Sequence, residues 1–241
     1  MFIGRKAELQ FLENKYRQKD GQLIVLYGRR RVGKTETLRQ FCKGKPHIFF
    51  SCRECTDKMQ LKNFSEKLLR ENIPARSYIT EFSDWEKAFR AITELPYGDA
   101  KKLVVIDEFP YMCKGNPSIP SILQNLWDEI LKDENVMLIL CGSAMRFIEK
   151  EIFAEKNPLY GRATGIYKMK EMGFYEAIQF FPNYSDRDKV LAYAILGGIP
   201  HYLKQFDSDL TLAENIKKNI LTKGCTCLLY TSPSPRDRQK S

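Results

Sequence analysis

A short glycine-rich segment ends in a lysine and a threonine, a combination that suits phosphate chemistry. Its residues follow the spacing G-x-x-x-x-G-K-T and are Gly28, Arg29, Arg30, Arg31, Val32, Gly33, Lys34 and Thr35. The glycines allow a tight turn whose N–H groups converge on a phosphate at the start of a helix. We therefore predict a triphosphate-binding loop in which Lys34 contacts the β- and γ-phosphates and the Thr35 hydroxyl binds Mg²⁺.

The residues on either side give this loop the context that a phosphate site needs. An apolar run, Leu23–Tyr27, predicts a strand before it, and Glu36–Cys42 predicts a helix after it. We assign the whole loop and Glu36 to the binding of ATP. The alternative is a chance glycine-rich turn, and a second acidic element farther along the chain argues against it.

Two adjacent carboxylates follow another apolar segment. Leu103–Asp107 predicts a buried strand, and Glu108 comes directly after it. At the end of a strand beside the loop, Asp107 would hold Mg²⁺ through water and Glu108 would polarise an attacking water. We assign Asp107 to metal binding, and Asp107, Glu108 and Lys34 to catalysis. The alternative is an acidic strand end that only caps the following turn.

A small polar residue follows a third apolar run. Val136–Cys141 predicts a strand that lies between the other two, and it leads into Gly142 and Ser143. The Ser143 hydroxyl would reach the γ-phosphate or the attacking water, as a sensor does. Serine at a junction of strand and helix is as often a helix N-cap, and the sequence leaves both roles open.

Composition sets broad limits on function. The chain has 241 residues, 43% of them hydrophobic and 29% charged, which is typical of a globular protein and excludes a disordered chain. No apolar run reaches the roughly 18 residues that a membrane span needs, and the first residues lack the pattern of a signal peptide. We therefore expect no membrane association and a cytoplasmic location. Seven irregularly spaced cysteines predict free thiols rather than disulfides.

The formal charge of +9 permits a nucleic-acid partner without requiring one. Part of this charge lies in the phosphate loop itself. No stretch combines clustered basic residues with interleaved aromatic ones, so a solvated basic surface is the simpler interpretation. The partner is therefore left as an unknown protein or nucleic acid.

Short apolar runs alternate with amphipathic segments, which predicts an α/β fold with a parallel sheet and helices on both faces. Trp127 lies on an apolar helical stripe and is expected in the core. The expected strands are Leu23–Tyr27, His47–Cys52, Leu103–Asp107, Val136–Cys141 and Gly165–Met169.

The later part of the chain has a different pattern. From Asp186 to Ile220 strand signals are absent, and two helices broken by Gly197–Pro200 are expected. We predict a P-loop core at residues 1–182, a partial helical lid at 183–224 and a tail at 225–241. From about Cys227 the tail resembles a translated sequencing-library adapter, so we expect it to be non-native, with a natural disordered end as the alternative.

Five motifs together resemble the archaeal-type ATPases of the AAA-like, STAND-related group. They occur in the family's order and are Phe2–Arg5 with Glu8 and Leu9, Tyr27–Thr35, Val105–Phe109, Leu140–Ser143 and Gly197–Leu203. The resemblance extends over residues 1–222. It implies a P-loop NTPase sheet of the ASCE type with strand order 5-1-4-3-2. Members of the family commonly continue past the lid into a winged helix and a further domain.

The resemblance also implies roles for residues outside the loop. Gly4 and Arg5 would line the adenine side, and Pro200 would mark a lid that senses the nucleotide. Arg162 lies where such proteins often carry a basic residue that faces the γ-phosphate. Without the resemblance, Arg162 is more simply a solvated arginine in a glycine-containing loop.

These features predict an ATP-binding protein whose Mg²⁺-dependent hydrolysis acts as a regulatory switch. Water positioned by Glu108 would attack a γ-phosphate held by Lys34, Mg²⁺ and the loop amides. The alternative is a nucleotide-gated module that binds a protein or nucleic acid with negligible turnover. A small-molecule kinase fits less well, because the Asp107–Glu108 pair favours water as acceptor. Nucleotide-dependent self-association is a further expectation.

Overall fold

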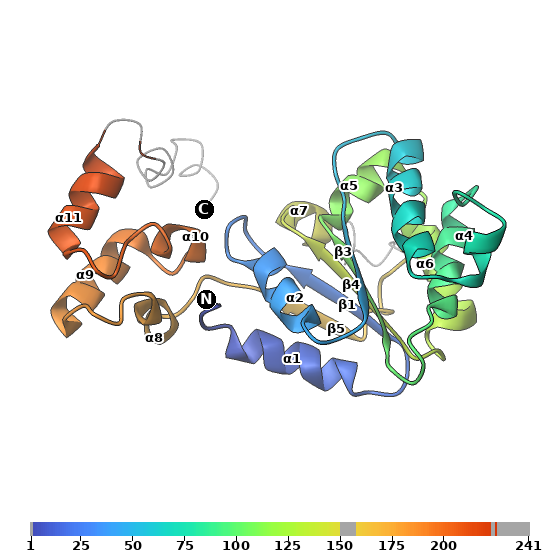
Figure 1. The fold of residues 1–241 in the computed structure, drawn as a ribbon, viewed down its shortest axis with the longest axis horizontal. Helices are drawn as coiled ribbons and strands as arrows, with labels where there is room; N and C mark the ends of the chain where they lie inside the picture. Colours follow the sequence, from blue (N-terminus) through green and yellow to red (C-terminus); the bar gives the residue numbers. More distant parts are fainter. Residues whose placement is uncertain (1, 150–157, 223–224, 226–241) are drawn as a thin grey trace. The chain divides into compact units, whose positions relative to one another are not determined.

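The structure, a computed structural model, describes residues 2–149, 158–222 and 225 (Figure 1). Its residue contacts divide the chain into two compact units. We call Lys6–Arg30 with Lys34–Met169 the sheet unit. We call Met1–Arg5, Arg31–Gly33 and Lys170–Ser241 the helical unit. The predicted boundary at residue 182, between a P-loop core and a helical lid, is a functional division and stays a prediction.

The sheet unit is built on five strands in the order β2-β3-β4-β1-β5, and every neighbouring pair is parallel. Read from the other edge, this is the predicted order 5-1-4-3-2, which is confirmed. Each strand agrees with its predicted range to within one residue at each end. The strands are β1 Gln22–Tyr27, β2 His47–Ser51, β3 Lys102–Asp107, β4 Val136–Gly142 and β5 Gly165–Lys168.

Helices cover both faces of this sheet (Figure 1). Helices α1 (Lys6–Tyr16) and α2 (Lys34–Cys42) lie on one face, and α3 (Asp57–Arg70), α4 (Trp85–Arg90), α5 (Phe109–Gly115) and α6 (Ile119–Leu126) lie on the other. Because both faces are covered, every residue of β1 and β4 is buried, which explains their unbroken apolar sequences.

An aromatic cluster forms the centre of the core under α3 and α4. The Phe64 ring packs against Phe50, Trp85 and Phe89 with centroids 5.1 to 5.6 Å apart. Trp127 starts a π-helical turn, Trp127–Leu131, that continues α6, and it is buried in the same core. Its predicted core position is confirmed. No helix of the described residues is both long and apolar enough to cross a membrane.

The helical unit contains more helices than the sequence predicted. Its described part holds α8 (Phe174–Ala177), α9 (Asp186–Leu196), α10 (Pro200–Leu203) and α11 (Leu212–Ile216), the last continued by a π-helical turn, Lys217–Leu221. The expectation of two helices between residues 186 and 220 is therefore wrong. Thr211 explains the extra break, because its side chain and that of Glu214 form a capping box that starts α11.

A tight backbone approach fixes the Gly197–Pro200 element inside the helical unit. The Met172 N–H donates to the Gly198 carbonyl at 2.7 Å. A Cβ atom on Gly198 would lie only 1.9 Å from the Met172 carbonyl oxygen. This close approach therefore requires glycine at position 198, two residues before the helix that begins at Pro200.

We expect Gly198→Ala to destabilise the helical unit by about 1–3 kcal/mol, because the backbone must shift to admit a methyl group. Urea unfolding and limited proteolysis within residues 170–222 measure this effect. Gly173→Ala is the matched control, since Gly173 has φ −67° and an added Cβ meets no atom within 4 Å. Equal stability of the two variants would contradict the steric argument.

Candidate nucleotide-binding site

The glycine-rich loop leaves β1 and enters α2, as predicted. Gly28 has no room for a side chain, because a Cβ there would lie 2.2 Å from the Met169 carbonyl oxygen. Gly33 has φ +93°, in the region that favours glycine, and Arg31 also has a positive φ of 71°. The loop backbone therefore turns sharply twice before the first turn of α2, where N–H groups are available for an anion.

Lys34 is the first residue of α2 and is buried, with its amine turned back to the loop. Its Nζ donates to the carbonyls of Gly28 and Arg29, each at 2.9 Å. Burial lowers the pKa of Lys34, while Cys141 and the carboxylates of Glu108 and Asp107 act in the opposite direction. The amine is thus held against the first two residues of the loop.

The two residues assigned to the metal contact each other. Thr35 Oγ1 donates to Asp107 Oδ2 at 2.8 Å, and Asp107 is buried at the end of β3. A hydroxyl beside a carboxylate is a donor set that suits Mg²⁺. Asp107 Oδ1 also accepts from the Glu108 N–H at 3.1 Å, so the same carboxylate caps the next turn. The contact with the Glu108 N–H is compatible with metal binding by Asp107, which stays a prediction.

Glu108 has an uncommon backbone conformation for a residue with a side chain, with φ 53° and ψ 43°. Helix α5 begins directly after it. The Glu108 carboxylate accepts from the Ser143 hydroxyl at 3.0 Å and from the Ser143 N–H at 3.2 Å. The candidate catalytic carboxylate is therefore held at the end of β4.

This contact bears on the two roles left open for Ser143. Helix α7 (Met145–Phe147) has Ala144 as its N-cap residue and no side-chain hydrogen bond at that cap. The Ser143 hydroxyl instead donates to Glu108. The structure thus favours a role of Ser143 in the site over a role in starting the helix.

Cys141 is a member of this site that sequence reasoning missed. It is fully buried, and burial followed by the Asp107 carboxylate raises its pKa well above the usual range. It therefore stays a neutral thiol between Lys34 and the acidic residues. Its position near the end of the strand that leads to Ser143 could have indicated this role. In the sequence alone, however, a cysteine within an apolar run cannot be told from an ordinary core residue.

The middle of the loop, Arg31–Gly33, packs inside the helical unit. A guanidinium nitrogen of Arg5 donates to the Val32 carbonyl at 2.6 Å, and the Arg5 N–H donates to Glu176 at 2.7 Å. The resemblance placed Arg5 and Gly4 beside adenine. In the structure, buried Arg5 holds the loop backbone, and Gly4 precedes it with φ +68°.

Pro200 also lies beside the loop residues of the helical unit. Its ring carbon Cγ is 3.6 Å from where a Cβ of Gly33 would stand. Arg31 donates to the Tyr202 hydroxyl at 3.4 Å. Neither Tyr202 nor Glu176 was expected at the site, because their partners come from distant parts of the chain.

The remaining loop residues are more exposed. Arg29 and Glu36 are open to solvent, and Arg30 contacts the Tyr111 hydroxyl at 3.4 Å. Their assignment to ATP binding stays a prediction.

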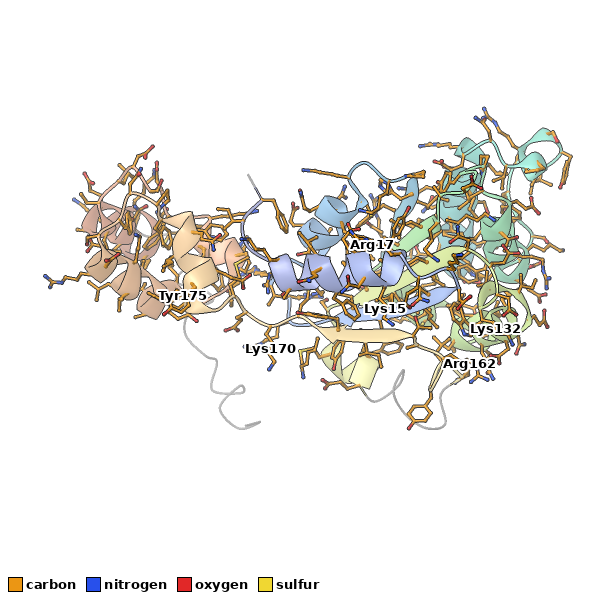
Figure 2. The ribbon with its side chains drawn as sticks, turned by 90° about the horizontal axis from the view of Figure 1, so that it is seen from below. Lys15, Arg17, Lys132, Arg162, Lys170 and Tyr175 are labelled. Atoms are coloured by element: carbon orange, nitrogen blue, oxygen red, sulfur yellow. The ribbon has the colours of Figure 1, made fainter. Side chains whose placement is uncertain are left out.

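Arg162 lies near the amino-terminal ends of the strands, whereas the phosphate loop follows the carboxyl-terminal end of β1. It precedes β5, and β5 runs parallel to β1, whose far end carries the loop. Arg162 is labelled in Figure 2, and its guanidinium donates three hydrogen bonds to the Asp128 carboxylate, at 2.6, 2.9 and 3.0 Å. The role facing the γ-phosphate that the resemblance implied is therefore not supported within this chain.

Comparisons with known proteins agree with this geometry. A family described as an ATPase domain predominantly from Archaea matches residues 2–206. The uncharacterized protein MJECL04 of Methanocaldococcus jannaschii is 33% identical over 205 residues, which are 85% of this chain and 44% of that protein. The chain therefore spans less than half the length of this relative. An uncharacterized ATP-binding protein of the same organism, MJ0423, is 53% identical over 45 residues, 19% of this chain and 76% of that protein.

Solved structures share the fold. The Walker-type ATPase PABY2304 of Pyrococcus abyssi superposes with a TM-score of 0.67 at 22% identity, covering 90% of this chain and 71% of that chain. The ORC1 protein of Aeropyrum pernix, solved in complex with DNA, gives a TM-score of 0.55 at 14% identity and covers 85% of this chain and 59% of that chain. At these identities the likeness shows the fold alone.

We expect Ser143→Ala to lower kcat for ATP by about tenfold or more with little change in KM, because Glu108 loses a donor that orients it. The unfolding free energy should fall by no more than about 1 kcal/mol. Steady-state phosphate release and urea unfolding measure the two effects. Ser118→Ala, at an exposed serine before α6, is the control. A large loss of stability with unchanged kcat would instead indicate a structural role.

Proposed function

This chain belongs to the family of ATPase domains found predominantly in Archaea, and we propose that it hydrolyses ATP, that the reaction requires Mg²⁺ and that it serves as a regulatory switch. The observation that carries the proposal is the convergence of Thr35, Asp107 and Glu108. Thr35 Oγ1 lies 2.8 Å from Asp107, and the next residue supplies a carboxylate held by Ser143.

Each of these residues has a part in the proposed mechanism. The loop amides and the Lys34 amine stabilise negative charge on the phosphates, and Glu108 orients the water that attacks the γ-phosphate in line. Mg²⁺ bound through Thr35 and Asp107 would neutralise charge on the β- and γ-phosphates.

The switch is supported by the grouping of loop residues with the helical unit. Val32 accepts from Arg5, and Gly33 lies beside Pro200, the first residue of α10. A phosphate that orders the loop backbone therefore acts on residues that the helical unit also holds. We propose residues 1–182 as the functional core and 183–224 as the lid that responds.

A nucleotide-gated binding module with negligible turnover is the second candidate. The contact between Ser143 and Glu108 favours it, because a carboxylate that already accepts two hydrogen bonds is less available to water. The partner in either case is a protein or a nucleic acid. The DNA complex of the Aeropyrum pernix protein supports the second of these. Nucleotide-dependent self-association is part of the same proposal.

We expect Glu108→Gln to reduce steady-state phosphate release by about 100-fold or more while ATP binding is retained, because the amide cannot accept a proton from water. Lys34→Ala should abolish ATP binding itself. Fluorescence of a labelled ATP analogue and phosphate release separate the two effects. Glu81→Gln, at an exposed residue remote in sequence from the motifs, is the control. Unchanged phosphate release in Glu108→Gln would exclude the hydrolytic role and favour the binding module.

Removal of Mg²⁺ with a chelator should abolish phosphate release and should be reversed by added Mg²⁺. Thr35→Ala should raise the Mg²⁺ concentration needed for half-maximal release, because a ligand is lost, whereas Thr35→Ser keeps the hydroxyl and should stay close to the wild type. A Mg²⁺ titration of phosphate release in the three proteins measures this. Equal titrations for Thr35→Ala and Thr35→Ser would show that the hydroxyl is not a ligand.

A further inference from the structure

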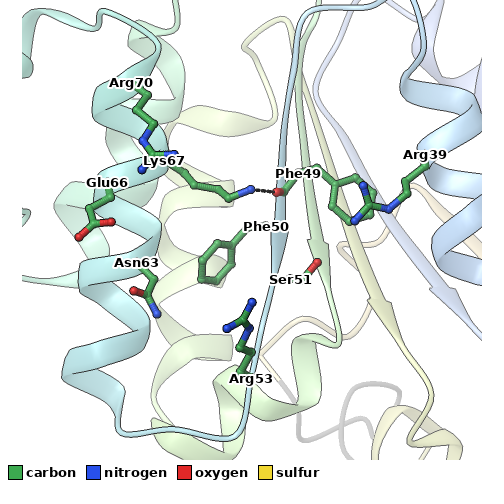
Figure 3. Close-up of a pocket in the computed structure, with 9 residues that line it drawn as sticks. All are labelled: Arg39, Phe49, Phe50, Ser51, Arg53, Asn63, Glu66, Lys67 and Arg70. Carbon is green, nitrogen blue, oxygen red and sulfur yellow. Dashed lines mark hydrogen bonds between the residues drawn. The ribbon is translucent and has the colours of Figure 1, made fainter.

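A basic groove runs along the free edge of the sheet, in the sheet unit. Strand β2 is the edge strand next to β3, and two adjoining cavities of about 430 and 260 Å³ lie along it. They share Phe49, Lys67 and Arg70, so they form one elongated hollow. We call it the β2-edge groove, and Figure 3 shows its larger part between α2, β2 and α3.

Four cationic side chains from three segments line this groove. Arg39 comes from α2, Lys67 and Arg70 come from α3, and Arg53 follows β2 (Figure 3). Within the described residues, none of the four forms an ion pair with a carboxylate, although Glu66 and Glu71 also line the groove. Elsewhere on this unit, cations such as Lys45 and Arg162 do form ion pairs. The groove therefore holds more positive than negative charge.

The lowered pKa of Lys67 is consistent with this concentration of positive charge. Partial burial is the largest cause that lowers its pKa, the nearby guanidiniums of Arg39 and Arg70 lower it further, and the Glu71 carboxylate acts in the opposite direction. An anion in the groove would relieve the repulsion among these cations. The geometry of the cavity, with cations on both of its walls, gives such an anion several contacts at once.

Two contacts on the edge strand limit which anion the groove can accept. The Lys67 amine donates to the Phe49 carbonyl, so a main-chain acceptor that a peptide strand would need is already used. Arg39 lies over the Phe49 ring, 4.8 Å from its centroid, which leaves that face of the ring closed to a stacking base. These contacts disfavour both strand addition by a peptide and stacking of a base on this face of Phe49.

We propose that the β2-edge groove binds the phosphodiester backbone of a nucleic acid strand without selecting its sequence. Its elongated form suits a chain of regularly spaced phosphates, and arginine is the residue that binds them in bidentate fashion. The nucleic acid would be the partner of the proposed switch, and only this link between binding and switching rests on the proposed function. The binding itself does not require ATP.

The groove is also linked to the ATP site through covalent and hydrogen-bonded neighbours. Arg39 lies on α2, the helix that begins with Lys34 of the phosphate loop. Ser51 lines the groove and is paired in register with Asp107, and the next N–H, that of Cys52, donates to the Asp107 carbonyl at 2.8 Å. A strand bound in the groove would therefore lie against the elements that carry both halves of the ATP site.

The test is fluorescence anisotropy of the full chain with a labelled single-stranded DNA of about 20 nucleotides, titrated at several salt concentrations. We expect binding of the wild type that does not depend on base sequence. Arg53→Gln with Arg70→Gln should weaken it by about five- to tenfold and reduce the salt dependence by about 0.7 per lost phosphate contact.

The matched control is Lys58→Gln with Lys62→Gln. It makes the same change in charge on exposed positions of α3 that do not line the groove. Both double variants should still bind a fluorescent ATP analogue, which reports intact folding. If ATP binding fails while DNA binding persists, the proposed function is wrong and the groove proposal stands.

Three results would overturn the groove proposal. One is the absence of DNA binding by the wild type at low salt. Another is an equal loss of binding in the groove variant and the control variant, which would indicate only a diffuse basic surface. The third is displacement of the DNA by polyglutamate at a concentration equal to that of unlabelled DNA, which would assign the groove to an acidic peptide.

Discussion

The hydrogen bond between Thr35 and Asp107 joins the two halves of the site, and the strand order makes it possible. Strands β1 and β3 are not neighbours, because β4 lies between them. Adjacent strands are about 4.8 Å apart, so the two strand ends are separated by about 10 Å. The first turn of α2 spans this gap and brings Thr35 Oγ1 to 2.8 Å from Asp107. Strand β4, which lies between β1 and β3, is therefore part of the site's geometry. It contains Cys141 and leads directly into Ser143.

The conformation of Glu108 is the second constraint. A left-handed backbone at a residue with a side chain costs about 1 kcal/mol or more, and it persists only where neighbours fix it. Here the Asp107 carboxylate binds the Glu108 N–H, Ser143 binds its carboxylate, and Pro110 follows in the first turn of α5. The two Ser143 contacts therefore orient the Glu108 carboxylate at the end of β4.

The sequence predicted the parts of this protein that local patterns encode. The five strands are continuous apolar runs because their sheet is covered on both faces, and the phosphate loop has a fixed spacing set by its turn. Partners distant in sequence were not predictable in this way. Arg5 meets Val32 and Glu176, the latter 171 residues away, and nothing in its local sequence indicates either contact. The two roles left open for Arg162 could not be separated from the sequence for the same reason, because only the parallel pairing of β5 with β1 shows which ends of the strands Arg162 lies near. The helical unit was underpredicted because its helices are short and depend on caps such as Thr211.

The phosphate loop and the β2-edge groove would be redundant if both bound the same ligand, but their side chains differ in burial and in hydrogen bonding. In the phosphate loop, Lys34 is buried and its amine is fixed by two carbonyls, so the charge is positioned for one phosphate group in one place. In the β2-edge groove the cations are exposed and lie on flexible side chains, which suits a ligand that can be shifted along its length. The sheet connects them, because the strand that borders the groove ends beside Asp107. A strand bound at the edge therefore has a direct structural route to the carboxylates that serve hydrolysis.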